Sequence, residues 1–266
     1  MVSQEREPQL VVLDTIDSTN EEAFRRLAVG RAAAGSLFLA FEQTAGRGRT
    51  GAWSSPRGEC IALSAVLTAS GERTVFFTMI GALAVCDTVA SFGLEPVIKW
   101  PNDVLVGGAK ISGVLADLRA QHPGLVVLGI GLNVRQSRAT LDGLGLAHAT
   151  SLALAGVNVQ PLATADRLIE ALRRWEATLA SSAAAVADAF AERTGLIERR
   201  CLLETPSARA EGVLQELTPH AELVLALDSG ASAVFKSEHV RQLRAVPATT
   251  VTDEHPAFPP ETDRLY

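Results

Sequence analysis

The stretch of this sequence that says most about fold and function is Glu42-Gln43-Thr44-Ala45-Gly46-Arg47-Gly48-Arg49-Thr50-Gly51-Ala52-Trp53. Three glycines within six residues allow backbone conformations with positive φ and leave amide N–H groups open to a ligand. Arg47 and Arg49 add fixed positive charge and forked donors that suit a carboxylate or a phosphate. We therefore predict that residues 43–58 form an anion-binding loop, although a solvated Gly/Arg surface loop has the same composition.

A second informative stretch is Lys99-Trp100-Pro101-Asn102-Asp103. Proline disfavours helix at the residue before it, so Asn102 and Asp103 are expected just past a strand end, where ligands often bind. Asp103 could hold Mg²⁺ or orient a nucleophile, and Asn102 could donate a hydrogen bond to an adenylate. The alternative is an Asx-type turn in which these side chains bond to their own backbone.

A third stretch is Gly107-Gly108-Ala109-Lys110-Ile111-Ser112-Gly113, which leads into a predicted strand. Lys110 is the only lysine between Lys99 and Lys236. It is either a ligand-binding cation or a solvated lysine at a strand edge.

The elements around these stretches predict an α+β fold with a mixed sheet, because strands and helices do not alternate regularly. We expect a helix to begin after Asp17-Ser18-Thr19-Asn20, where a polar cap precedes an acidic first turn. Further helices are expected at residues 73–91 and from about residue 161 to 193. Strands are expected at residues 10–13, 36–41, 61–68, 97–100, 110–118 and 125–130.

Beyond Arg199 the pattern changes to four short strands, at residues 212–217, 223–227, 233–235 and 240–243. Such spacing indicates a small barrel-like module. From Pro247 the sequence is rich in Pro, Thr, Asp and Glu, which is typical of a disordered tail. We therefore divide the 266 residues into domains at 1–197 and 198–246 and a tail at 247–266.

Composition excludes several classes of protein. The formal charge of −6 and the pI of about 5.4 disfavour a general nucleic-acid binder. The apolar run at residues 75–92 contains Asp87, which favours a buried helix over a membrane span. Cys60, Cys86 and Cys201 show no metal-binding or disulfide spacing, and residues 1–7 lack a signal-peptide pattern, so we expect a reduced, cytoplasmic protein.

Taken in this order, the three stretches resemble the biotin–protein ligase family. The resemblance extends to the Ser18-Thr19-Asn20 stretch and to Gly129-Ile130-Gly131-Leu132-Asn133, and covers residues from about 10 to 245. It implies a class II synthetase-like mixed β-sheet flanked by helices, followed by a small SH3-like β-barrel. Thr50 and Ala52 stand where the family often has basic residues.

The resemblance also implies roles for individual residues. Biotin would be bound by Ser18, Thr19, Asn20, Gln43, Arg47, Arg49 and Lys110. ATP or the adenylate would be bound by Arg47, Arg49, Trp53, Asn102, Lys110 and Asn133. The catalytic residues would be Arg47, Lys110 and Asp103, with Asp103 also the candidate ligand for Mg²⁺.

By the same resemblance, we expect biotin to be activated with ATP to biotinyl-5'-AMP. The biotinyl group would then pass to a lysine of a biotin carboxyl carrier domain. We expect no DNA partner, because no helix-turn-helix pattern precedes residue 10. We also expect no membrane partner, and a protein that is a monomer or a weak dimer. The alternatives are a lipoate–protein ligase, which lacks the pairing of Gly-Arg-Gly-Arg with Lys-Trp-Pro-Asn-Asp, a non-enzymatic phosphate- or nucleic-acid-binding module, and an interaction protein built on the β module.

Overall fold

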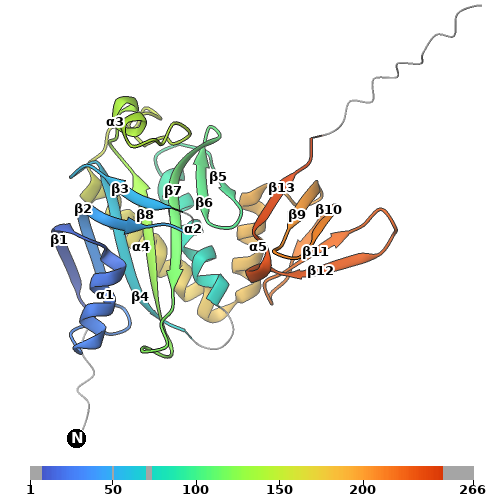
Figure 1. The fold of residues 1–266 in the computed structure, drawn as a ribbon, viewed down its shortest axis with the longest axis horizontal. Coiled ribbons are helices and arrows are strands. Elements are labelled where there is room, and N and C mark those ends of the chain that lie inside the picture. The colour runs from blue at the N-terminus through green and yellow to red at the C-terminus, as the bar shows by residue number, and fades with distance from the viewer. Residues whose placement is uncertain (1–7, 50, 70–73, 248–266) are drawn as a thin grey trace, which may run out of the picture.

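A computed structural model describes residues 8–49, 51–69 and 74–247. Within these ranges, eight strands form a mixed sheet in the order β1-β2-β4-β8-β7-β6-β5, with β3 paired to β2 (Figure 1). Only β1 and β2 are parallel among the paired strands. The strands are β1 Leu10–Ile16, β2 Leu37–Arg47, β3 Ala52–Ser55, β4 Cys60–Thr68, β5 Pro96–Lys99, β6 Asp103–Val106, β7 Ala109–Asp117 and β8 Leu125–Asn133.

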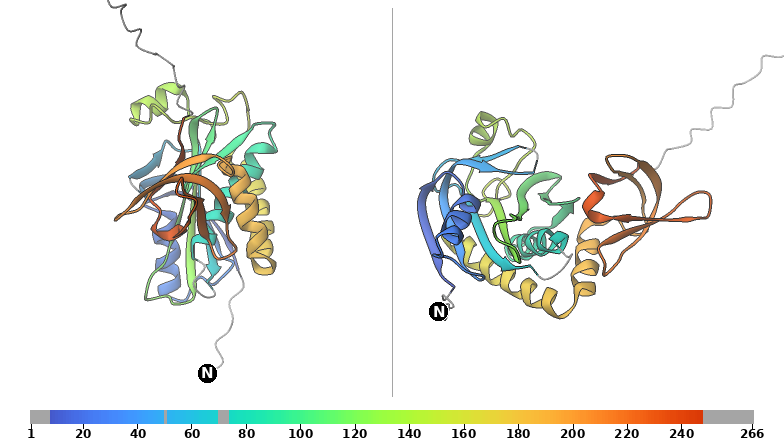
Figure 2. Two further views of the ribbon diagram at one scale, coloured as in Figure 1. Left: turned by 90° about the vertical axis from the view of Figure 1, so that its right-hand side faces the viewer. Right: turned by 60° about the horizontal axis from the view of Figure 1, so that its bottom comes forward.

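Helices cover both faces of this sheet. One face is covered by α1, which packs Ala23 and Phe24 against Phe38, Val66 and Val127. The other face is covered by α2, which α4 and α5 pack against in turn. Figure 2 shows α4 running into α5 and on to the second sheet. The helices are α1 Thr19–Ala28, α2 Thr74–Ala90, α3 Arg138–Gly143, α4 Pro161–Ser181 and α5 Ala183–Thr194.

The alternation of side chains on β8 explains why one face is packed and the other is open. Large apolar side chains at every second position belong to the core beneath α2: Val126, Leu128, Ile130 and Leu132. Between them stand Gly129 and Gly131, which have no side chain to fill the opposite face. Because neighbouring residues of a strand point to opposite faces, the sequence places a core on one side and a hollow on the other.

The helix α2 confirms the prediction of a buried apolar helix over residues 73–91. Twelve of its seventeen residues are buried. Its one acidic residue, Asp87, accepts a hydrogen bond of 2.9 Å from Nε1 of Trp175 on α4. Across the described residues, no helix is long and apolar enough to cross a membrane.

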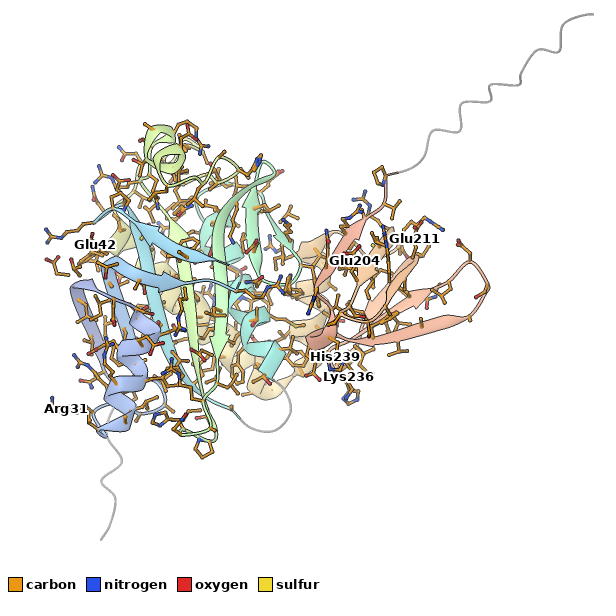
Figure 3. The ribbon with its side chains drawn as sticks, in the orientation of Figure 1. Arg31, Glu42, Glu204, Glu211, Lys236 and His239 are labelled. Atoms are coloured by element: carbon orange, nitrogen blue, oxygen red, sulfur yellow. The ribbon has the colours of Figure 1, made fainter. Side chains whose placement is uncertain are left out.

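The second sheet is antiparallel, in the order β12-β11-β10-β9-β13. Its elements are β9 Arg200–Glu204, β10 Arg209–Leu217, β11 Glu222–Ala226, β12 Ser232–Lys236, the 3₁₀ helix η1 Ser237–His239 and β13 Gln242–Ala245. The side chains of Glu211 and Lys236 lie on its surface (Figure 3). Its inner side chains continue the core under α2, since Leu203 and Leu214 belong to the same apolar cluster as Phe190.

Trp100 joins the two sheets. Its Nε1 donates a hydrogen bond of 3.1 Å to the carbonyl oxygen of Val240, and its ring packs edge-on against Phe190 of α5. Only 5% of its surface is exposed, so the indole N–H has exchanged water for this carbonyl.

The α+β class, with its flanking helices and its C-terminal β module, is confirmed. The prediction of a loop over all of residues 43–58 is wrong, because β2 continues to Arg47 and pairs with β3 as a hairpin. The sequence pattern also missed β6, β9 and α3. The helical region at 161–193 breaks at Ser182, whose hydroxyl accepts from the backbone N–H of Ala185 and caps α5. The predicted tail falls almost entirely on residues 248–266, outside the described residues.

We expect Trp100→Phe to lower the free energy of unfolding by about 1–3 kcal/mol, because the buried carbonyl of Val240 loses its donor. Amide hydrogen exchange in β13 should rise as the second sheet loosens. Trp175→Phe is the control, since it also removes an indole hydrogen bond but lies away from the second sheet. A similar rise in β13 exchange in both variants would contradict the role of Trp100.

Candidate functional site

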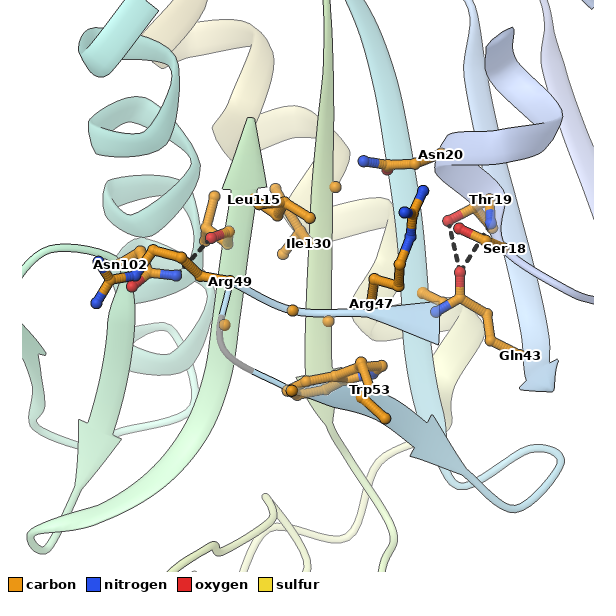
Figure 4. A pocket seen from close by; sticks show the side chains of 18 of the residues that line it. Ser18, Thr19, Asn20, Gln43, Arg47, Arg49, Trp53, Asn102, Leu115 and Ile130 are labelled. Carbon is orange, nitrogen blue, oxygen red and sulfur yellow. Dashed lines mark hydrogen bonds between the residues drawn. The ribbon is translucent and has the colours of Figure 1, made fainter. Parts of the chain in front are cut away.

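A cavity of about 270 Å³ lies on the face of the larger sheet opposite α2 (Figure 4). It is formed by the start of α1, the β2–β3 hairpin, the β5–β6 turn and the strands β7 and β8. Ten of the eleven residues predicted for the site line this cavity: Ser18, Thr19, Asn20, Gln43, Arg47, Arg49, Trp53, Asn102, Asp103 and Lys110. Residues 18–20, 43–53 and 102–110, which are separated in the sequence, therefore meet in one cavity.

Uncharged polar groups form one end of the cavity. The side-chain oxygen of Gln43 accepts hydrogen bonds from the backbone N–H of Thr19 (2.7 Å) and from its hydroxyl (3.0 Å). The buried hydroxyl of Ser64 lies 2.7 Å from the Thr19 hydroxyl and 2.6 Å from Oδ1 of Asn20. The Thr19 proton goes to Gln43 and the Asn20 carbonyl oxygen can only accept, so the Ser64 hydroxyl is the donor in both contacts and shares its one proton between them. These bonds fix the side chains before a ligand arrives.

Glycines form the floor of the cavity. A Cβ on Gly131 would lie 2.2 Å from the ring of Trp53, and one on Gly129 would lie 2.5 Å from Oδ1 of Asn20. Gly113 on the neighbouring strand also lies under the Trp53 ring. The indole N–H of Trp53 is buried and has no hydrogen-bond partner among the described residues. Trp53 thus lies flat against the floor of the cavity.

The hairpin glycines act differently from the prediction. Positive φ is found at none of Gly46, Gly48 and Gly51. A Cβ on Gly46 would lie only 2.2 Å from the carbonyl oxygen of Trp53, so this glycine is required by the close pairing of β2 with β3. Gly48 donates 2.7 Å to the carbonyl of Gly51 and closes the turn. Backbone pairing in the hairpin therefore takes up N–H groups that the sequence interpretation left open to a ligand.

Cations line the rest of the cavity, and two of them are already ion-paired. Arg47 pairs with Glu21 in the first turn of α1. Lys110 Nζ lies 2.6 Å from Oδ1 of Asp103. Asp103 and Lys110 therefore face each other across the paired strands β6 and β7, with 22% and 39% of their side chains exposed.

The asparagines predicted for the site have different positions. Asn102 lines the cavity, but its Nδ2 donates 2.7 Å to the carbonyl of Val114, which ties the β5–β6 turn to β7. Asn133 lies outside the cavity lining. Its Nδ2 donates to the carbonyl of Thr150, and its Oδ1 accepts from Gln136. Asn133 is buried, and these bonds hold it against the segment that follows β8.

The sequence interpretation missed Ser64 and Glu21. Ser64 interrupts the buried run Cys60–Thr68, and a polar residue in such a strand needs a partner, so a signal was present. Glu21 was interpreted only as an acidic residue of a first helical turn, and its pairing with Arg47 depends on tertiary structure. No group of three His, Cys, Asp or Glu side chains able to hold a metal occurs among the described residues.

Fold and site together define a class: a ligand-binding α+β protein whose pocket places neutral polar groups beside cations suited to an anionic ligand. Residues 12–133 match the model of the biotin/lipoate A/B protein ligase family. The biotin–[acetyl-CoA-carboxylase] ligase of Mycobacterium tuberculosis is 31% identical over 89% of this chain and 90% of its own length. The biotin–[acetyl-CoA-carboxylase] ligase of Paracoccus denitrificans is 30% identical over 85% of this chain and 98% of its own length. The chain belongs to the biotin–protein ligase family.

Other relatives are longer. The bifunctional ligase/repressor BirA of Bacillus spizizenii is 38% identical over 48% of this chain, and the match covers 41% of that relative. Among solved structures, the biotin protein ligase of Aquifex aeolicus in complex with biotin and ATP has a TM-score of 0.73 at 23% identity. The match covers 90% of this chain and 99% of the Aquifex aeolicus chain. At that identity the likeness shows the shared fold.

We expect Gly131→Ala to lower stability by about 1–3 kcal/mol, because the new methyl group overlaps the Trp53 ring. Urea unfolding measures this loss. Adding Trp53→Ala should restore part of it, since the overlap is then removed. Gly51→Ala is the control, because a Cβ there meets no atom within 4 Å. Strictly additive losses in the double variant would show that the Trp53 ring does not rest on Gly131.

Proposed function

We propose that this protein activates biotin with ATP to biotinyl-5'-AMP and transfers the biotinyl group to a lysine of a biotin carboxyl carrier domain. The observation that carries the proposal is the shape of the pocket. Hydroxyl and amide groups fixed by hydrogen bonds stand at one end, and Arg47 and Lys110 line the same cavity of about 270 Å³. A neutral ureido ring with a carboxylate on a short chain matches both parts.

In the first step, a carboxylate oxygen of biotin attacks the α-phosphorus of ATP, the bond to the β-phosphate breaks, and pyrophosphate leaves. Two anions must come together, so positive charge inside the site lowers the barrier. We assign Lys110 to the carboxylate and α-phosphate, and Arg47 with Arg49 to the same oxygens. Ser18, Thr19, Asn20 and Gln43 would hold the ureido ring and fix the distance of the carboxylate from the cations.

In the second step, the ε-amine of the acceptor lysine attacks the carbonyl carbon of the mixed anhydride. The carbon–oxygen bond breaks, AMP leaves with the electron pair, and the amine loses a proton. Asp103 is the carboxylate in the cavity lining, so it is the group on the protein that would accept this proton. We therefore assign Asp103 to the incoming lysine.

The ATP side would use Trp53, Asn102 and Asn133. The Trp53 ring, which lines the cavity, offers a flat surface for adenine. Mg²⁺ fits this site, since it needs only one or two carboxylates when phosphates and water supply the other oxygens. Asp103 would be its protein ligand, and the ion would offset charge on the phosphates.

We further infer a division at residue 197 between a catalytic domain and an SH3-like module at 198–246. Every residue lining the cavity precedes residue 147, and the second sheet begins at Arg200. We also infer a cytoplasmic location, which the three buried free cysteines fit, and a monomer or weak dimer.

The test is ATP-dependent transfer of biotin to a purified biotin carboxyl carrier domain, followed by mass. We expect a single added biotinyl group and one AMP and one pyrophosphate for each transfer. Lipoate and a lipoyl domain form the matched arm, because the family model includes both kinds of ligase. Transfer of lipoate in preference to biotin would favour a lipoate–protein ligase instead. No transfer, with a thermal stability that RNA raises and that biotin, lipoate and ATP do not, would favour a nucleic-acid-binding module.

We expect Lys110→Gln to slow adenylate formation at least about a hundredfold, the loss typical of one electrostatic donor. Transfer from supplied biotinyl-adenylate should fall much less, because one negative charge is gone once the anhydride exists. Quench-flow on ATP consumption and single-turnover transfer separate the two steps. Lys99→Gln is the control, since Lys99 is exposed and lies outside the cavity lining. Equal loss in both steps would refute the assignment of Lys110.

A further inference from the structure

Glu21, in the first turn of α1, connects two arginines from distant parts of the chain. Its Oε1 accepts from Nη2 of Arg47 on the hairpin and from Nη2 of Arg119, the latter at 2.6 Å. The side chain of Glu21 is 27% exposed. The hydrogen bonds and positive charge of Arg119, with a further contribution from Arg47, hold the pKa of Glu21 below its ordinary value. Glu21 is therefore a carboxylate at neutral pH.

Arg119 fixes this carboxylate in place. Its guanidinium carbon lies 3.9 Å from the ring centroid of Phe24, one turn further along α1. Its Nη2 also lies 3.5 Å from a carboxylate oxygen of Asp117. Arg119 thus has an aromatic surface and two carboxylates as neighbours, and it compensates the charge of Glu21 whether or not Arg47 is engaged.

Arg47, by contrast, depends on Glu21. Its side chain is 63% exposed, and among the described residues Glu21 is the one group with which it pairs. A free arginine side chain samples many rotamers, and ordering it costs about 2 kcal/mol of entropy. The guanidinium has five N–H groups, so a pair through Nη2 leaves donors for an anion in the cavity that Arg47 lines.

The start of α1 makes this arrangement possible. Ser18 caps the helix, and Thr19 and Asn20 line the cavity, so the next residue of the first turn stands at the cavity edge. Figure 4 shows the Arg47 side chain extending from the hairpin toward Asn20. A carboxylate this close to a site for two anions would repel them unless it were compensated, and Arg119 supplies that compensation.

We propose that Glu21 is a positioning residue that holds Arg47 over the cavity, so that its remaining N–H groups meet the ligand already oriented. This inference rests on the proposed function for its effect on catalysis. Its structural part does not, because the pair is formed by two residues of this chain.

The first test needs neither biotin nor ATP. Trypsin cleaves after arginine only when the backbone can open, so cleavage after Arg47 or Arg49 reports on the hairpin. We expect Glu21→Gln to speed this cleavage about fivefold, the upper range for one partly exposed ion pair. Glu22→Gln is the control: Glu22 is the next residue of the same helix turn, but it pairs with Arg25 and Arg26. It should leave the rate unchanged.

The second test measures release of preformed biotinyl-adenylate and kcat/KM for biotin. In the wild-type background, Glu21→Gln should speed release and lower kcat/KM by about fivefold each. In an Arg47→Ala background, each change should be less than about twofold. Glu22→Gln should change neither. An equal effect of Glu21→Gln in both backgrounds, or no change in hairpin cleavage, would overturn the proposal. If the wild type forms no adenylate, the proposed function fails, and the cleavage test still decides the role of Glu21.

Discussion

The close approach of Trp53 to the backbone of β8 is the constraint on which this site depends. The ring lies where a side chain on residue 131 would be, so any residue other than glycine there would push the Trp53 ring away from the sheet. The same strand carries large apolar residues on its other face, and these pack beneath α2. One strand therefore builds both the core and the floor of the cavity, and a change on either face disturbs the other because interiors are close-packed.

Charge is organised in the same economical way. The chain is acidic overall, yet its cavity needs cations, and Arg47 and Lys110 each have a carboxylate neighbour. These pairs order the two cations without accumulating unbalanced positive charge. An anionic ligand then exchanges with, or adds to, an interaction already in place, so less conformational entropy is lost on binding. The exchange is feasible because both pairs are partly exposed and therefore weak.

Much of this could be predicted from the sequence. The three motif stretches identified seven cavity residues and the Ser18-Thr19-Asn20 stretch identified three more, because the residue types that suit an anionic or polar ligand are concentrated in these short segments. The hairpin was missed because Gly46 was interpreted as flexible, whereas its lack of a Cβ serves close pairing between strands. The position of Asn133, bonded to Thr150 and Gln136, and the pairing of Glu21 with Arg47 depend on segments brought together only by folding. Local patterns carry no information on such contacts.

The second sheet affects the cavity through one short segment. The carbonyl of Val240 accepts the indole hydrogen bond of Trp100. Asn102, two residues after Trp100, stands at the cavity wall. The carbonyl of Arg241, the residue after Val240, lies 3.5 Å from Nη2 of Arg49 on the hairpin. Adjacent residues of one segment thus contact both the β5–β6 turn and the hairpin. Through these two contacts the module touches both walls of the cavity, although it contributes no residue to the lining.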